Sequence, residues 1–186
     1  MVSEDLWYEI VDGPDLEQGD FISYLPTFVP EYSSDLIQQP LVQNVIERDM
    51  AGKMYRYNVV IMSQSCDLEQ RKLKFVLVCP YWSLEDLGRK EKKFLEPKIQ
   101  EEIRKGNMYS YHMLNECRLD EKKQGIQVVE FKSVFSVPFD FLTSFANAQG
   151  KRLRLRSPYK EKLSHAFGNS FSRVALPVDI PSFSKK

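Results

Sequence analysis

The sequence predicts a mixed α+β domain in which a small, mostly antiparallel β-barrel or sheet is closed by a C-terminal amphipathic helix. Short apolar runs alternate with turn residues over much of the chain, as they do in antiparallel sheets. One stretch near the C-terminus instead repeats its apolar residues at intervals of three and four, the spacing of one helix face. The 186 residues, 42% of them hydrophobic, suffice for one core, so we expect a single domain over residues 1–186.

The expected strands follow one another between turns. The run from Phe21 to Leu25 comes after Gly19-Asp20 and stops at Pro26. A turn at Asp49 to Lys53 separates two further strands and suits a hairpin. The short run that ends at Pro80 is typical of a central buried strand. The strands after the first are expected at 41–48, 54–63, 73–80, 109–114 and 127–136, which gives a barrel core over about residues 18–136.

Two helices have clear end signals. Pro97 at the favoured first turn and the Gly106-Asn107 stop predict a helix over residues 97–105. Ser157 as N-cap and Pro158 at the first helical position start the C-terminal helix, over about 157–176. We expect its apolar stripe to pack on the protein's own sheet rather than on a partner. The stripe comprises Leu163, Phe167, Phe171 and Val174.

The apolar runs are too short to span a bilayer, and the segment Met1 to Asp5 lacks the positive flank of a signal peptide. We therefore expect a cytoplasmic protein without a membrane partner. Cys66, Cys79 and Cys117 are widely spaced and odd in number, which indicates reduced thiols rather than disulfides. Without ligands at metal spacing around His112 or His165, we expect no metal and no other cofactor.

Formal net charge is zero, but the charges are unevenly distributed. Residues 1–20 carry seven acidic side chains and no lysine or arginine, whereas residues 151–186 carry nine basic side chains against Glu161 and Asp179. Two interpretations remain open: the two ends lie together and screen each other, or the basic end receives an acidic partner or phosphates.

A polar segment, Ser63-Gln64-Ser65-Cys66-Asp67, directly follows an apolar strand. Small hydroxyls, a thiol and a carboxylate at a strand end suit nucleophile activation, a phosphate or oxyanion site, or a turn capped by Ser65 and Asp67. If Cys66 is a nucleophile, it needs a base within hydrogen-bond reach, and His165 or His112 would have to supply it.

Three arginines, Arg152, Arg154 and Arg156, alternate with Leu153 and Leu155. In an extended strand the guanidinium groups share one face and the leucines enter the core. Such a face suits bidentate binding of RNA phosphates or of an acidic protein surface. A solvated edge that discourages aggregation is the alternative.

The strand sequences resemble those of the MazF/PemK superfamily, whose fold is an SH3-like barrel. A more specific likeness, over about residues 18–181, is to a family of uncharacterised bacterial proteins associated with that barrel. The first likeness rests on Gly19-Asp20-Phe21-Ile22, Val59 to Ser63, Val76 to Pro80 and Val128 to Phe131; the second rests on Ser63 to Leu68 (SQSCDL), Arg154 to Tyr159 and Phe171 to Pro177.

The resemblance implies two activities. MazF-type toxins cut RNA, and here Arg56 and Ser83 are the candidates for the catalytic pair, with Arg152 and Arg154 holding the RNA backbone. However, Tyr57 replaces the proline that follows the toxin's arginine, and Tyr81-Trp82 separate Ser83 from Pro80. The similar CalpT-like proteins of anti-phage defence bind a protein partner through this barrel without cutting RNA.

We therefore expect a non-catalytic MazF-like regulatory module that binds a protein, in a bacterial toxin–antitoxin or anti-phage system. RNA binding and a homodimer are compatible with this expectation. The alternatives are a sequence-specific endoribonuclease that uses Arg56 and Ser83, and a cysteine-dependent enzyme that uses Cys66 with His165.

Overall fold

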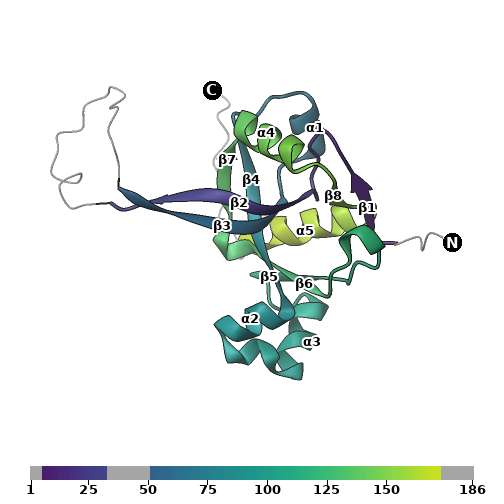
Figure 1. The fold of residues 1–186 in the computed structure, drawn as a ribbon. Helices are drawn as coiled ribbons and strands as arrows, with labels where there is room; N and C mark the ends of the chain where they lie inside the picture. Colours follow the sequence, from purple (N-terminus) through teal and green to yellow (C-terminus); the bar gives the residue numbers. More distant parts are fainter. Residues whose placement is uncertain (1–5, 33–50, 173–186) are drawn as a thin grey trace, which may run out of the picture.

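The computed structural model describes residues 6–32 and 51–172, and shows a mixed α+β protein with antiparallel sheets (Figure 1). The strands are β1 (Tyr8–Val11), β2 (Phe21–Pro30), β3 (Gly52–Ile61), β4 (Phe75–Ser83), β5 (Tyr111–Leu114), β6 (Gln127–Glu130), β7 (Phe135–Pro138) and β8 (Arg152–Leu155). The α-helices are α1 (Ser65–Glu69), α2 (Leu84–Lys90), α3 (Pro97–Lys105), α4 (Phe139–Gln149) and α5 (Tyr159–Phe171).

Strand β4 is the centre of the larger sheet, whose order is β2-β3-β4-β6-β5. Its one edge pairs with β3, while its other edge pairs with β7 along its first half and with β6 at its end. The smaller sheet joins β1 to β8, and a bridge between Asp20 and Arg154 connects the two sheets. Both β1 and β8 lie outside residues 18–136, so the strands extend beyond the range that we expected for the barrel core.

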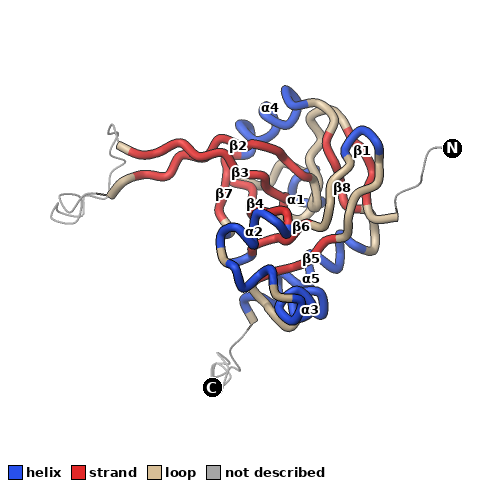
Figure 2. The backbone as a smooth tube through the Cα atoms, turned by 60° about the horizontal axis from the view of Figure 1, so that its bottom comes forward, coloured by secondary structure: helices blue, strands red, loops and turns tan. Residues whose placement is uncertain are grey.

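The β2–β3 hairpin projects from the body of the protein (Figures 1 and 2). Its base is apolar and buried, with Ile22 and Leu25 on β2 and Val59 to Ile61 on β3, whereas its outer half is exposed. A bulge at Tyr24, whose φ is 54°, shifts the register between these halves. The hairpin pairs β3 with β2. The sequence predicted instead that the strand at 54–63 pairs with one at 41–48, which lies outside the described residues.

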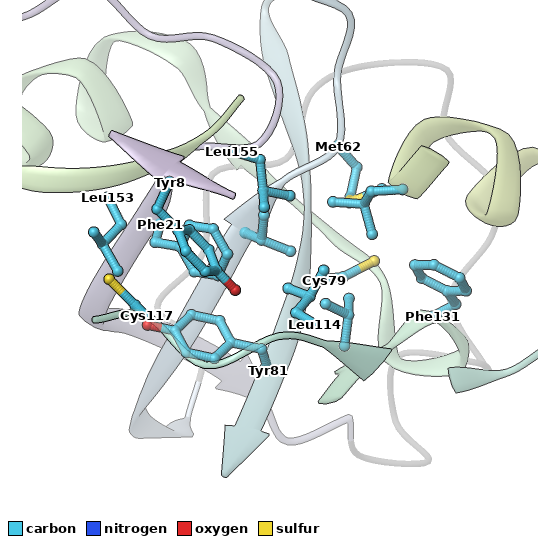
Figure 3. Close-up of a cluster of buried hydrophobic side chains, with 13 residues drawn as sticks. Tyr8, Phe21, Met62, Cys79, Tyr81, Leu114, Cys117, Phe131, Leu153 and Leu155 are labelled. Carbon is cyan, nitrogen blue, oxygen red and sulfur yellow. The ribbon is translucent and has the colours of Figure 1, made fainter. Parts of the chain in front are cut away.

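Among the residues that the structure describes, buried side chains form three clusters, one for each group of helices. The first lies between the two sheets and α5, and Figure 3 shows Tyr8, Phe21 and Tyr81 packed within it. The second lies under α4, and the third lies between α2, α3 and the β5–β6 pair. Burial of a large apolar side chain contributes about 1.5–3 kcal/mol, so these clusters fix where the helices dock.

Helix α5 packs on the first cluster through Leu163, which has no exposed surface, with Ala166 and Phe167 beside it. This confirms that the helix docks on its own core. Phe171, at its end, is exposed, and Val174 lies outside the described residues. The start was predicted wrongly: α5 begins at Tyr159 with Pro158 in the cap position, and Ser157 instead donates a hydrogen bond of 2.6 Å to Glu161.

The helix at Pro97–Lys105 is confirmed, with Gly106 in the left-handed conformation at its end. The single strand expected over 127–136 is wrong. A 3-10 turn at Phe131–Ser133 divides it into β6 and β7, because Phe131 turns into the first cluster and contacts Phe167 at a ring distance of 5.4 Å. Helices α1, α2 and α4 and strand β1 were not expected.

Candidate functional site

The first two arginines of the Arg152–Arg156 segment are held within the protein. Arg152 is buried and donates to the Asp20 carboxylate at 2.9 Å and to the carbonyl oxygens of Gly13 and Asp15. Arg154 donates to the Asp20 carboxylate and to Glu17 at 2.6 Å. Since these groups are used in intramolecular bonds, Arg152 and Arg154 hold β8 against the turn before β2. Arg156 is exposed.

Glu17 links this cluster to α5, because its other carboxylate oxygen accepts from the Lys160 ammonium at 2.9 Å. Burial opposes ionisation of Glu17, but the hydrogen bond from Lys160 and the charges of Arg154 and Lys160 prevail and lower its pKa. The acidic and basic ends of the sequence therefore meet and screen each other here, as one of the two interpretations expected. We call Glu17, Asp20, Arg152, Arg154 and Lys160 the ion-pair cluster.

The polar segment Ser63 to Asp67 is tied to the fold by its hydroxyls. The Ser63 hydroxyl accepts from the Leu77 N–H at 2.9 Å, and the Ser65 hydroxyl accepts from the Gln18 N–H at 3.2 Å. Ser65 begins the short helix α1, with the exposed Gln64 in its cap position. The two serines hold this segment against β4 and the turn before β2.

Cys66 is exposed on α1, and its thiol lies 3.9 Å from a carboxylate oxygen of Asp67. Both histidines are elsewhere: His112 on β5 and His165 on α5 line one hollow, to which Cys66 does not belong. The structure brings the histidines together and does not bring Cys66 to either. Burial of Cys79, with the charge of Glu130, raises the pKa of that thiol to about 12.

Arg56 and Ser83 occupy different places. Arg56 is exposed on β3 and lines a hollow of about 290 Å³ with Tyr24 and Phe145; Ser83 is not among the residues that line it. Ser83 caps α2: its hydroxyl accepts from the Asp86 N–H at 3.0 Å and donates to the Asp86 carboxylate at 2.7 Å. Capping is a sufficient structural role for this serine.

A groove of about 590 Å³, which we call the aromatic groove, opens between the hairpin and strands β4 and β7. Tyr57 is its centre, since its ring lies 6.3 Å from the ring of Trp82 and 6.0 Å from that of Phe135. Tyr55, two residues along β3, continues the row outward at 6.1 Å. The groove is lined by Thr27, Phe28, Val29, Pro30, Tyr57, Pro80, Trp82, Lys90, Glu130, Ser133, Phe135 and Ser136.

The rim of the aromatic groove is polar and ordered by contacts within the chain. The Trp82 indole donates to the Glu130 carboxylate at 2.9 Å, and the Lys132 ammonium lies 3.3 Å from the same carboxylate. The Lys90 ammonium lies 3.2 Å from the centre of the Trp82 ring. An apolar centre with a polar rim is the usual composition of a protein-binding surface.

The edge of the hairpin disfavours another strand. Pro26 and Pro30 lie in β2, the edge strand of the larger sheet, and neither has an N–H to donate. At Ser23 both backbone groups are already hydrogen-bonded to the Gln149 side chain, which accepts from the N–H at 3.2 Å and donates to the carbonyl at 2.8 Å. A partner would therefore bind by side-chain contacts rather than by adding a strand.

Neither a known protein-family model nor a curated protein matches this chain. Over residues 6–32 and 51–172, no helix combines the length and apolar character needed to cross a membrane. Within the same ranges, no three His, Cys, Asp or Glu side chains are grouped where they could hold a metal ion.

The sequence pointed to Tyr57 and Trp82 only as departures from the toxin pattern. Their placement in one groove depends on the pairing of β3 with β4.

Proposed function

We propose that this protein is a non-catalytic binding module on an SH3-like barrel, and that an extended, proline-containing segment of a partner protein docks in the aromatic groove. The row of rings formed by Tyr55, Tyr57, Trp82 and Phe135 carries the proposal. The bridge that joins the two antiparallel sheets around a common core supports the barrel.

The chemistry of the groove favours proline. Rings set at angles to one another form shallow apolar slots, and a polyproline II segment loses little conformational freedom when it enters such slots. The protected edge of β2 argues against strand addition, the other common way to bind an extended peptide. The resemblance to MazF/PemK proteins supports a role for this module in a bacterial toxin–antitoxin or anti-phage system.

Two neighbouring residues of β3 provide a matched test. Tyr55 continues the aromatic row and is 43% exposed, whereas Met54 is 63% exposed and points to the other face of the hairpin. The chain is purified with its partner from the native host as wild type, as Tyr55→Asp and as Met54→Asp. We expect a stoichiometric partner that is lost from Tyr55→Asp and kept by Met54→Asp.

Hydrogen exchange then locates the interface. On binding, exchange should slow in the segments that contain Tyr57, Trp82 and Phe135, and a peptide from the partner's proline-containing segment should reproduce the effect. Recovery of the chain alone would refute the proposal, as would equal retention of the partner by both variants. A partner that protects only residues outside the groove would refute the assigned surface.

A further inference from the structure

Both histidines of the sequence line one hollow of about 230 Å³ between α3, β5 and α5, which we call the histidine pocket. It is separate from the aromatic groove and shares none of its lining residues. Helix α5 presents Lys162 and His165 to it at a spacing of three, so they lie on one face of the helix. His112 enters from β5.

The walls of the histidine pocket are basic. Arg104 and Lys105, at the end of α3, line it together with Lys162, and none of the lining residues is aspartate or glutamate. Glu101 pairs with Arg104 at 2.6 Å and with Lys105 at 3.5 Å from outside the pocket. Lys162 has no ion pair among the described residues, so its charge is available to an anion in the pocket.

His112 is a buried polar side chain whose ring stacks on that of Phe131 at 6.1 Å. Its exposed fraction is 8%, and within the described chain its ring makes no hydrogen bond. Its nitrogens are not among the fully enclosed polar atoms, so the small exposed part of the imidazole opens to the pocket that it lines. The imidazole can therefore hydrogen-bond to a ligand in the pocket without giving up a bond within the protein.

Burial, and then the charge of Lys162, lower the pKa of His112 to about 4. The imidazole is therefore neutral when the pocket is empty at neutral pH. An anion bound between His112 and Lys162 would offset the effect of the Lys162 charge, since a negative charge favours the protonated ring. Binding of an anion should accordingly raise this pKa.

From this geometry we propose that the histidine pocket binds a small phosphate monoester. Lysine is a common phosphate ligand, and Lys162, His165 and His112 offer donors from two elements to one tetrahedral group. The volume is below the roughly 300–1,000 Å³ of pockets for drug-sized ligands, which suits a compound no larger than a sugar phosphate. Tyr111 and Phe131, also in the lining, provide apolar surface for the carbon part.

The test observes the histidines directly. Protein labelled with ¹³C and ¹⁵N in histidine is titrated with inorganic phosphate and with ribose 5-phosphate, and with ribose as the uncharged control, at constant pH and ionic strength. We expect the signals of His112 and His165 to move saturably with both phosphates and not with ribose. A pH titration with the phosphate bound should show the pKa of His112 raised.

Two lysine variants distinguish a site from general attraction. Lys162→Glu should weaken binding about tenfold or more, because it removes a charged donor and adds repulsion. Lys98→Glu changes the same charge on the exposed surface of α3, outside the pocket, and should leave the affinity unchanged. Amide spectra of both variants check that each is folded.

Three results would overturn the proposal: histidine signals that do not move at millimolar phosphate, signals that ribose moves equally, or equal weakening by the two lysine variants. The site would be established if both phosphates bind saturably and if Lys162→Glu, but not Lys98→Glu, weakens their binding. Neither outcome depends on the aromatic groove or its partner.

Discussion

The Arg152 guanidinium donates a hydrogen bond of 2.9 Å to the Asp20 carboxylate, and the two side chains are only 1% and 0% exposed. Arg154 donates to the same carboxylate from β8. Asp20→Asn would leave both guanidinium groups without their shared anion in the interior. We expect a loss of about 3–5 kcal/mol in the free energy of unfolding, measured by urea denaturation.

An exposed ion pair serves as the control for Asp20. Lys151 and Glu121 lie 2.7 Å apart, with 56% and 59% of their side chains exposed. Glu121→Gln should therefore lower the free energy of unfolding far less than Asp20→Asn does. Similar losses for the two variants would mean that burial of the Asp20 pair does not govern its contribution.

The lowered pKa of His112 predicts a loss of stability in mild acid. The folded value is about 4 and the ordinary value is 6.5, so the unfolded chain takes up the proton first as the pH falls. Stability is fully present above 6.5 and declines towards 4. At about 1.4 kcal/mol per pKa unit, the whole loss is about 3 kcal/mol.

Urea unfolding measured between about pH 7.5 and pH 5 should show about 2 kcal/mol of this loss. Above pH 5 Glu17 does not contribute to the slope, because its lowered pKa matters only below its ordinary value of 4.5. His112→Gln keeps a polar side chain of similar size and should remove most of the slope. An unchanged slope in His112→Gln would assign the acid sensitivity to another group. Phosphate should be left out of the buffers.

Gly52 predicts how the hairpin tolerates a side chain. A Cβ there would lie 2.3 Å from Cζ of Phe28 and 2.7 Å from the carbonyl oxygen of Val29, so the ring and the backbone would both have to move. We expect Gly52→Ala to cost about 1–3 kcal/mol of local stability, seen as faster amide exchange in β2 and β3. Slowed exchange in the hairpin would contradict the close contact.

Gly168, within α5, is the matched glycine, because a Cβ there meets no atom within 4 Å. Gly168→Ala should stabilise the protein by about 0.5–1 kcal/mol, since alanine has less backbone freedom to lose in a helix. Thermal and urea unfolding measure the difference. A loss of stability would show that the open space at this position is needed.

Alkylation of thiols tests the hypothesis of a cysteine nucleophile. Cys66 is exposed, whereas Cys79 and Cys117 are buried. Iodoacetamide should modify Cys66 in the native protein and the other two only after unfolding, as peptide mass spectrometry would show. Because neither histidine contacts Cys66, its rate below neutral pH should match that of a free cysteine. A markedly faster rate would revive the enzymatic alternative.

Local sequence signals predicted the helices and strands themselves better than the breaks between neighbouring strands. Pro97 and Gly106 gave correct bounds for α3 because both residues act through their own backbone geometry. The break at Phe131–Ser133 has no such signal: the alternation of Gln127 to Ser136 suits one strand, and the turn forms because β6 and β7 pair with different parts of β4.

The same limit applies to the candidate sites. The opposite charges of the two ends favoured mutual screening as one of two interpretations, because acidic and basic segments that lie together neutralise each other. The arrangement of His112 beside α5, or of Tyr57 beside Trp82, depends on which strands and helices pack together, and a single sequence does not contain that information. Alternation also placed the arginines on a common face without showing that Arg152 would be buried by the turn before β2.

The pairing of β1 with β8 constrains how the molecule is made. Tyr8 leaves the ribosome well before its partner Leu155, which lies far along the chain. Until then the Tyr8 ring, which packs against Phe21 in the finished core, has no cover from β8. The nascent chain therefore leaves this aromatic side chain without its cover while the residues between β1 and β8 are made, and a chaperone that holds such surfaces would bind it there.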